Sequence, residues 1–421
     1  MIKHLKTSNV GPMATMELDF GKRLNILTGD NGLGKSFLLD IVWWVLTRRW
    51  PSEINSHLTA GKKALPAKEG DATIGYSFSA KSTGVDDEST YQREWQLWTS
   101  RLGRPANPGL VLYAMSDGSF AVWDPHRNYW REEVQDRPAA YVFSPSEVWD
   151  GLAVSDSRWL CNGLIRDWAS WQKEKGEAFT YLTEALAALS PPFVEKLEPG
   201  ALTRISLDDV RDMPTIKMPY GQEVPVLHAS AGIRRIIALA YFLVWAWEEH
   251  NQAAKQRGVP VTTQVTFLID EVESHLHPSW QLRIIPALLK VIEKLTSTEV
   301  QLIAATHSPL IMASLEPLFA PERDAWFDFN LDGDGVTLQR HDFEKHGEAG
   351  NWLTSEAFDL QSSRSIEYKK LIDDASALLE APKPDAGAIR RMQEKLVQAL
   401  NPKDSFLFNW RAICESKEWL A

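Results

Sequence analysis

Cysteine is scarce in this chain, because the 421 residues include only Cys161 and Cys414. Two cysteines exclude the framework of several disulfides with which small secreted domains compensate for a small core. A chain of this length is long enough for two or three domains with large apolar cores. The cysteine content therefore fits a reducing compartment, and we expect a cytoplasmic protein.

Long hydrophobic runs are also lacking. The longest one covers residues 236–247, whereas a helix that spans a membrane needs about 20 apolar residues. The N-terminus does not resemble a signal peptide, and no sustained heptad pattern indicates long coiled-coil arms. We therefore expect no membrane partner and no extended arm.

An excess of positive charge is lacking as well, since the formal net charge is −11. This charge argues against a surface that binds nucleic acid non-specifically, although it leaves a local basic groove open. Tryptophan, by contrast, is abundant, with 18 residues. We interpret most of these rings as core residues, with base stacking or partner anchoring as the alternative.

The most informative stretch is residues 29–36, which match the phosphate-binding loop pattern G-x-x-x-x-G-K-[ST]. An apolar run before the loop predicts a strand, and residues 37–46 predict a buried helix, which is the context that the motif requires. The glycine-rich backbone and the helix N-terminus are suited to a polyphosphate. We predict a site for ATP and Mg²⁺, with Lys35 on the β- and γ-phosphates and Ser36 on the metal. The predicted binding residues are Gly29, Asp30, Asn31, Gly32, Leu33, Gly34, Lys35 and Ser36.

Two further strands end in residues that suit the same site. Residues 265–269 predict a buried strand that ends at Asp270 and Glu271, which is the Walker B pattern. Asp270 is predicted to hold Mg²⁺, and Glu271 is predicted to polarise the attacking water. The next predicted strand, residues 302–306, is followed by His307, which we interpret as a switch histidine for the γ-phosphate. Short strands that alternate with helices predict an α/β fold with a mostly parallel sheet.

In their order along the chain, these motifs resemble those of ABC-type ATPases, and more narrowly those of the branch that holds OLD-family, RecF-like and SMC-like proteins. The resemblance covers roughly residues 1–50 and 225–315. It rests on the phosphate loop, on Ser230-Ala231-Gly232, on the Walker B residues, on the string Glu273-x-His275-Leu276-His277-Pro278 and on His307. Residues 230–232 correspond to the signature segment, which in this family caps the γ-phosphate held by the other subunit. A serine hydroxyl and glycine N–H groups at a helix N-terminus also make an anion site on physical grounds.

The resemblance implies an ABC-ATPase head, which is a P-loop NTPase with a mostly parallel sheet and an antiparallel β-subdomain. Residues 1–145 would form its N-terminal half and residues 201–320 its C-terminal half. We expect a helical arm at residues 146–200, and a β-hairpin followed by an α-helical extension at residues 321–421. The family also has a glutamine loop, and the motifs of this sequence leave its position open. Asp332 and Asp334 form a D-x-D pair, but we interpret it as a hairpin tip rather than a nuclease site.

The implied activity is slow ATP hydrolysis in a head-to-tail homodimer or higher even oligomer. The C-terminal stretch at residues 352–367 is similar to parts of PtuA-like ATPases from bacterial anti-phage systems, which act with a separate effector, typically a nuclease. The expected partners are therefore a second copy of the chain and such an effector. Two alternatives stay open, namely a RecF-like or SMC-like repair ATPase that binds DNA directly and a transporter ATPase subunit.

Overall fold

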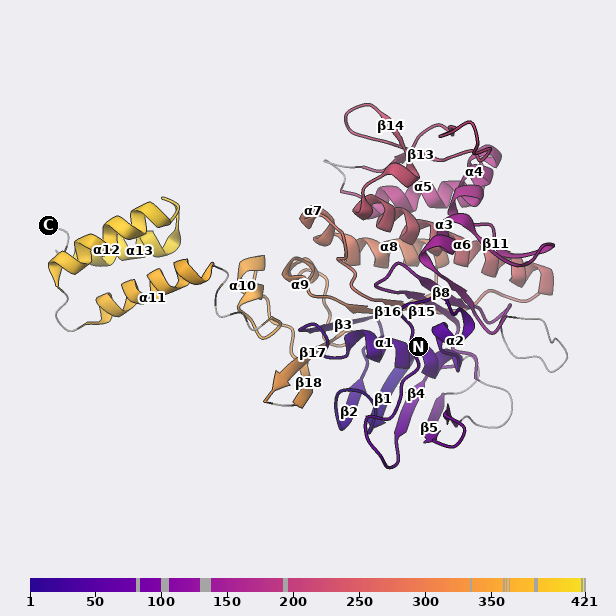
Figure 1. Ribbon diagram of the computed structural model, residues 1–421, viewed down its shortest axis with the longest axis horizontal. Coiled ribbons are helices and arrows are strands. Elements are labelled where there is room, and N and C mark those ends of the chain that lie inside the picture. The colour runs from indigo at the N-terminus through magenta and orange to yellow at the C-terminus, as the bar shows by residue number, and fades with distance from the viewer. Residues whose placement is uncertain are drawn as a thin grey trace. The chain divides into compact units, whose positions relative to one another are not determined.

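The computed structural model describes most of the chain in two compact units, Met1–Ala349 and Gly350–Ala421 (Figure 1). We treat the two units separately. The described residues are 1–80, 84–99, 106–128, 138–191, 196–333, 335–358, 360, 362, 364–381, 385–417 and 419.

The larger unit is built on an eight-stranded sheet with the order β18-β17-β3-β16-β15-β7-β8-β9. The strands from β17 to β7 run parallel, and β18 and β8 continue the sheet as antiparallel neighbours. Because the carboxyl ends of parallel strands meet at one edge of a sheet, the segments after β3, β15 and β16 all begin at the same edge. The eight strands are β3 (Leu24–Gly29), β7 (Leu110–Ala114), β8 (Phe120–Trp123), β9 (Tyr141–Phe143), β15 (Gln264–Ile269), β16 (Glu299–Ala305), β17 (Ala325–Asp332) and β18 (Gly335–His341).

An antiparallel sheet with the order β2-β1-β4-β5-β6 makes a second layer. Its strands are β1 (Ile2–Ser8), β2 (Thr15–Asp19), β4 (Thr73–Phe78), β5 (Val85–Gln92) and β6 (Leu97–Trp98). Two small antiparallel sheets complete the β-structure, one from β10 (Leu152–Ser155) and β11 (Arg158–Cys161), the other from β12 (Glu198–Pro199), β13 (Thr215–Lys217) and β14 (Glu223–Pro225).

Helix α1 (Lys35–Thr47) is the centre of the main core. It packs on β3, β7, β15 and β16 of the large sheet and on β1 of the second sheet. Apart from Ser36 and Phe37, all its residues are buried, as expected for a helix whose sequence is apolar on every face. Trp44 stacks on Trp50 with ring centroids 5.4 Å apart. The helix that begins at the phosphate loop is therefore fixed from both sides.

Helix α6 (Ala231–Arg257) covers the opposite face of the large sheet. Along β8, Phe120 stacks on Phe242 of α6 at 4.3 Å, whereas Ala121 and Trp123 belong to the core around α1, as alternation along a strand requires. Helices α5 (Glu177–Leu189) and α8 (Ile284–Thr296) pack with α6 on that side (Figure 1). The remaining helices of this unit are α2 (Pro51–Ile54), α3 (Pro145–Asp150), α4 (Leu164–Glu174), α7 (Pro278–Gln281), α9 (Pro309–Leu315) and the single 3₁₀ turn η1 (Val226–His228).

The C-terminal unit is a small helical body. Helix α10 (Ala349–Leu353) spans the division between the units, and α11 (Ile366–Glu380), α12 (Ala386–Ala399) and α13 (Ser405–Ser416) follow. A separate apolar core that includes Ile389, Leu396 and Trp410 holds these helices together. Within the described part of the chain, no helix combines the length and the apolar character needed to cross a lipid bilayer.

The expected α/β class, with a mostly parallel sheet and an antiparallel second sheet, is confirmed. Two segments differ from the expectation. The helical arm expected at residues 146–200 contains a β-hairpin as well, because residues 152–161 form β10 and β11 between α3 and α4. The β-hairpin expected with the helical extension at residues 321–421 is β17–β18, and it belongs to the large sheet instead, because β17 pairs with β3. Asp334 at the tip of that hairpin lies outside the described residues.

Candidate nucleotide site

The phosphate loop connects β3 to α1, at the edge of the sheet where the parallel strands end. Gly29, Gly32 and Gly34 have positive φ angles of 121°, 80° and 109°, which only glycine adopts without strain. A Cβ atom at Gly29 would lie 2.2 Å from the carbonyl oxygen of Phe329 in β17, so this position also excludes any side chain. Asp30, Asn31 and Gly32 at the tip of the loop are exposed. The loop is thus rigid at its base and open at its tip.

Lys35 lies inside the curve of the loop. Its Nζ donates hydrogen bonds to the carbonyl oxygens of Gly29 and Asp30, both at 2.7 Å. The residue is only 5% exposed, and this burial lowers the pKa of its ammonium group to about 8, although Asp270 opposes the shift. A bound anion would favour the charged form of this buried ammonium group.

The predicted Mg²⁺ ligands lie next to each other. Asp270 follows β15, is buried, and accepts hydrogen bonds from the hydroxyl groups of Ser36 and Ser116. Burial raises the pKa of Asp270, although these two hydrogen bonds oppose the shift. Hydroxyl and carboxylate oxygens are the hard ligands that Mg²⁺ prefers, so the residues fit this metal.

His307 reaches the same place from the end of β16. Its ring donates a hydrogen bond to the backbone of Gly29, and burial, followed by the charge of Lys35, lowers its pKa. Glu273 fixes the backbone here, because its carboxylate accepts hydrogen bonds from the Thr306 hydroxyl at 2.8 Å and from the His307 N–H. Glu271 is half-buried and has a φ of 44°, a left-handed conformation that costs energy in a residue other than glycine.

The signature segment lies at the start of α6. Ser230 caps the helix through a 3.4 Å hydrogen bond from the Ile233 N–H to its Oγ. Ser230 and Ala231 are exposed, and Gly232 packs so closely on the backbone of His275 that a Cβ atom would lie 2.6 Å from its carbonyl oxygen. In the part of the chain that the structure describes, no hydrogen bond joins residues 230–232 to the phosphate loop. The structure therefore brings together the phosphate loop, Asp270 and His307, with the signature segment beside His275.

Sequence reasoning missed three polar residues at this site. Ser116 follows β7 and bonds to Asp270, and Glu273 was noticed only as part of a family string. Arg235 lies one turn into α6, and its Nη2 donates to the carbonyl oxygens of Met115 at 3.0 Å and Asp270 at 3.4 Å. The only signal for Arg235 was a charged residue at the start of a long apolar run.

A family model described as "AAA domain, putative AbiEii toxin, Type IV TA system" matches residues 24–313. Among known proteins, the Septu protein PtuA of Bacillus thuringiensis is 22% identical over 321 residues, which cover 73% of this chain and 72% of that protein. The retron Ec83 probable ATPase of Escherichia coli is 28% identical over 221 residues, covering 52% of this chain and 36% of that protein.

A second retron protein, the retron Vc95 probable ATPase of Vibrio cholerae, is 31% identical over 114 residues. That match covers 27% of this chain and 20% of the retron protein, so both retron proteins have long regions without a counterpart in the alignment. Among solved structures, an SMC head bound to the C-winged helix domain of ScpA aligns with 82% of this chain and 98% of its own, at a TM-score of 0.44 and 18% identity.

Proposed function

The chain belongs to the AAA-domain family whose model spans residues 24–313, and from this membership we propose that it is an ATP-dependent switch for a separate effector protein. The chain is an ATPase, like the relatives that carry this name. The proposal concerns how ATP controls the association of two copies of this chain and, through it, the effector. Two copies enclose two nucleotides, each held between the phosphate loop of one copy and residues 230–232 of the other.

The observation that carries this proposal is the exposure of two complementary half-sites. The phosphate loop, Asp270 and His307 converge at one edge of the sheet, and the loop tip is open. The N-terminus of α6 is also exposed, and the first N–H groups of a helix are free to bind an anion. A phosphate chain that is bound by the first half-site has a further exposed edge, which the second half-site of another copy can cover.

The residues of the first half-site suit the chemistry of hydrolysis. Lys35 and the loop N–H groups bind the β- and γ-phosphates, and Ser36 and Asp270 hold Mg²⁺, which neutralises phosphate charge when bound. Glu271 orients the attacking water and accepts its proton as a general base. His307, which is already hydrogen-bonded to the loop backbone, contacts the γ-phosphate and distinguishes ATP from ADP.

The relatives support a role in anti-phage defence with a separate effector. The Septu PtuA match extends over most of both chains, and two retron ATPases match the ATPase region.

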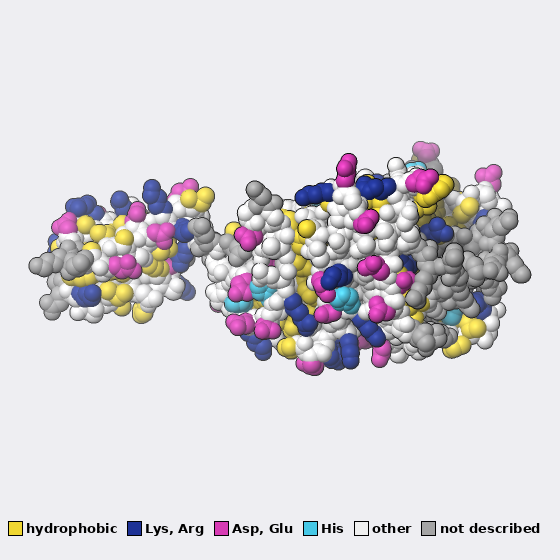
Figure 2. Space-filling model, turned by 90° about the horizontal axis from the view of Figure 1, so that it is seen from below, with side chains coloured by type: hydrophobic (Ala, Val, Ile, Leu, Met, Phe, Trp, Pro, Cys, Tyr) yellow, Lys and Arg dark blue, Asp and Glu magenta, His cyan; other side chains and the backbone are white. Residues whose placement is uncertain are grey.

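Direct DNA binding as in a repair ATPase receives less support. On the face that Figure 2 shows, Lys and Arg side chains are interspersed with Asp and Glu side chains rather than gathered in one patch. A DNA-binding protein would show an affinity for duplex DNA that falls steeply with salt. A shallow or absent salt dependence would favour the effector model.

The Glu271→Gln variant tests the dimer. Loss of the general base is expected to reduce turnover by about 10²- to 10⁴-fold, while ATP binding persists, so the closed dimer accumulates. Light scattering with ATP and Mg²⁺ should show twice the mass of one chain. Lys35→Ala should stay at the mass seen without nucleotide, and Glu299→Gln, an exposed residue at the opposite end of β16, should behave as the wild type.

The same two variants test the effector. The trapped Glu271→Gln protein and the nucleotide-free Lys35→Ala protein are used as bait in native cells. A nuclease or toxin that co-purifies with only one of them supports ATP control of an effector. Equal recovery of every partner with both variants would contradict it.

A further inference from the structure

Arg235 is a buried charged residue at the start of α6 that the chemistry described above does not use. Its side chain belongs to a residue that is only 7% exposed. A buried charge costs free energy unless it is well paired, so this position calls for an explanation. Burial lowers the pKa of the guanidinium group, whereas the charges of Asp270, Asp117 and Glu271 oppose this shift. The group therefore lies inside the protein near the carboxylates of the nucleotide site.

The hydrogen bonds of Arg235 reach the backbone at the ends of two neighbouring strands. Its Nη2 donates to the carbonyl oxygen of Met115 at 3.0 Å and to that of Asp270 at 3.4 Å. Met115 directly follows β7 and Asp270 directly follows β15, and these two strands pair in parallel. One side chain of α6 thus contacts the edge of the large sheet at which the Walker B residues lie.

The carbonyl group of Asp270 belongs to the peptide bond that leads into Glu271. The φ angle of Glu271, which is 44°, sets the direction of its side chain relative to this peptide bond. Such a left-handed conformation persists in a residue other than glycine only where the surrounding contacts impose it. On the other side, the Ser274 N–H donates to the Glu271 carbonyl oxygen at 2.9 Å. Arg235 and this turn therefore hold Glu271 from both sides.

The second acceptor of Arg235 is also next to a residue of the site. The Met115 carbonyl group belongs to the peptide bond that leads into Ser116, whose hydroxyl group donates to the Asp270 carboxylate. A guanidinium group suits such a pair of acceptors because its N–H donors form a rigid planar fork, which a lysine ammonium group lacks. Arg235 thus fixes the backbone beside the residue that bonds to Asp270 and beside the predicted base.

Arg235 also has a donor that is not in use. Its Nε is buried and has no hydrogen-bond partner among the described residues, and the 3.4 Å contact with Asp270 is long for a hydrogen bond. An unpaired buried donor costs free energy, and hydrogen bonds in catalytic sites often tighten only when the substrate is bound. We therefore expect the contact with Asp270 to shorten in the complex with ATP.

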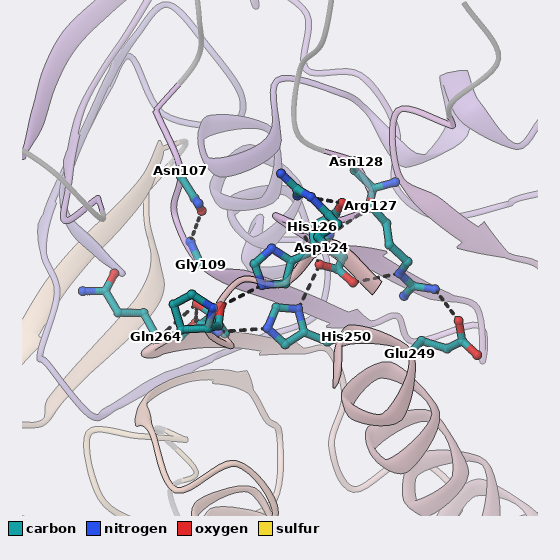
Figure 3. A network of polar contacts seen from close by, with 12 residues as sticks. Asn107, Gly109, Asp124, His126, Arg127, Asn128, Glu249, His250 and Gln264 are labelled. Carbon is teal, nitrogen blue, oxygen red and sulfur yellow. Dashed lines mark hydrogen bonds and ion pairs between the residues drawn. The ribbon is translucent and has the colours of Figure 1, made fainter. Parts of the chain in front are cut away.

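The far end of α6 is attached through a separate network (Figure 3). His250 accepts a hydrogen bond from the Thr262 N–H at Nε2, and its Nδ1 donates to Asp124 at 2.9 Å. Arg127, in the turn after β8, donates to Asp124 at 2.7 Å and to Glu249 of α6 at 3.1 Å. At about 1.5 Å per residue, this network lies roughly 20 Å along the helix from its first turn. It offers an arginine that ties α6 to the sheet without touching the nucleotide site.

From these contacts, we propose that Arg235 is a positioning residue, which holds Glu271 in the orientation that activates the attacking water. The inference rests on the role proposed for Glu271 in the preceding section and deepens it, since it names the contact that keeps the base in place. In the proposed dimer, the start of α6 contacts the nucleotide of the other copy. Arg235 connects that contact to the base of its own chain.

The test compares Arg235→Met with the wild type in single-turnover hydrolysis, with the full-length protein in excess over radiolabelled ATP. The rate should fall by at least about tenfold, because a shift of about 1 Å in a catalytic group costs up to about 100-fold. The Kd for a fluorescent ATP analogue should change by less than about threefold, because a group that acts on the chemical step lowers the rate and not the binding. A wild-type rate of the variant overturns the proposal.

Arg235→Lys decides the question if Arg235→Met does not fold. This variant keeps the positive charge and loses the planar fork, so its rate should be at least about threefold below that of the wild type. An unchanged rate in a folded Arg235→Lys protein would then overturn the proposal.

A double-mutant cycle with Glu271→Gln separates positioning from a general loss of stability. In the Glu271→Gln background, Arg235→Met should change the rate by less than about twofold, because the base on which it acts is already absent. Arg127→Met is the matched control, since it removes the arginine that ties the far end of α6. Its rate should stay within about twofold of the wild type even where its melting temperature falls.

Two results of this cycle would overturn the proposal, namely an equal loss from Arg235→Met in both backgrounds and an equal loss in Arg127→Met. A Glu271→Gln protein that hydrolyses ATP at the wild-type rate would overturn the role of Glu271 and this proposal together. A wild-type rate of Arg235→Met beside an inactive Glu271→Gln protein would overturn this proposal alone.

Discussion

Lys35 shows how one buried side chain links pH to nucleotide binding. Burial holds its pKa at about 8 in the nucleotide-free chain, below the ordinary value of about 10.4 for lysine. Bound phosphates favour the charged form and raise that pKa. Above about pH 8, ATP binding must therefore take up a proton, and affinity falls as the pH rises, by up to about tenfold per unit.

We predict that the Kd for a fluorescent ATP analogue is several-fold higher at about pH 9 than at about pH 7.5. Lys35→Arg is the control, since its guanidinium stays charged at both values, and its affinity, although lower, should not change with pH in this way. An identical pH dependence in both proteins would assign the effect to another group.

Asp40 makes a second prediction at the residue scale. It is buried on α1 behind the phosphate loop and accepts a 2.9 Å hydrogen bond from the Tyr113 hydroxyl. Burial raises the pKa of this carboxyl to about 8. The folded chain therefore keeps the proton between about pH 4 and pH 8, where the unfolded chain loses it, so this group lowers the free energy of unfolding as the pH rises through that range.

Asp40→Asn removes this titration. We take the free energy of unfolding of the variant minus that of the wild type. This difference should increase as the pH rises from about 5 to about 7.5, by up to about 1.4 kcal/mol per pH unit. Urea unfolding at the two pH values measures the change. A difference that stays constant or shrinks would mean that Asp40 is ionised in the folded chain.

The residues of the phosphate loop could be predicted because their chemistry is encoded within eight consecutive positions of one strand, loop and helix. The positions of Asp270 and His307 at one edge of the sheet could be predicted because each follows a recognisable buried strand, while their roles stay predictions. Ser116 and Arg235 could not, since their importance arises only when β7, β15 and α6 meet in space. A hydroxyl in a turn and an arginine in an apolar helix have no local pattern that identifies their partners.

At the scale of the elements, the contact between the start of α6 and His275 is the tightest point of the signature segment. Gly232→Ala would improve the intrinsic helix propensity by up to about 1 kcal/mol. The new Cβ atom, however, would lie 2.6 Å from the carbonyl oxygen of His275, and such overpacking typically costs about 1–3 kcal/mol. We expect the clash to exceed the gain.

The variant should therefore unfold at a lower temperature and form less ATP-dependent dimer than the wild type. Gly176→Ala is the matched control, because a Cβ atom at that position meets nothing within 4 Å, and its stability should change by less than about 0.5 kcal/mol. A more stable Gly232→Ala protein that still dimerises would show that the α6 contact is not tight in solution.

Elements with strong periodicity were also the ones that the sequence predicted. The apolar runs of β15 and β16 and the buried helix α1 agree with their predicted types. The β10–β11 hairpin lies within residues 146–200, where we expected a helical arm, because the spacing of Leu160 and Leu164 also fits a helix although α4 begins only at Leu164. The position of β17 in the large sheet depends on pairing with β3, which is 300 residues away in the register Ala325 to Asn25, and no local pattern encodes such a pairing.

At the scale of the whole molecule, our proposal assigns both halves of a nucleotide site to one chain, the phosphate loop and residues 230–232. The two units of the chain each have a core of their own, in the larger one around α1 and in the smaller one among α11, α12 and α13. This division suits a switch in which the larger unit associates with and separates from a second copy. The smaller helical unit can stay folded throughout, because it has a core of its own. The central claim is that a complete site requires two chains.

Mixing two inactive variants tests this claim most directly. Lys35→Ala disables the phosphate loop and leaves residues 230–232 intact, whereas Ser230→Arg blocks the signature segment and leaves the loop intact. A mixed dimer has one fully intact site, made from the loop of one chain and the signature segment of the other. We predict that each variant alone hydrolyses almost no ATP and that the mixture regains phosphate release. No recovery in mixtures in which mixed dimers are shown to form, or full activity of Ser230→Arg alone, would contradict the account.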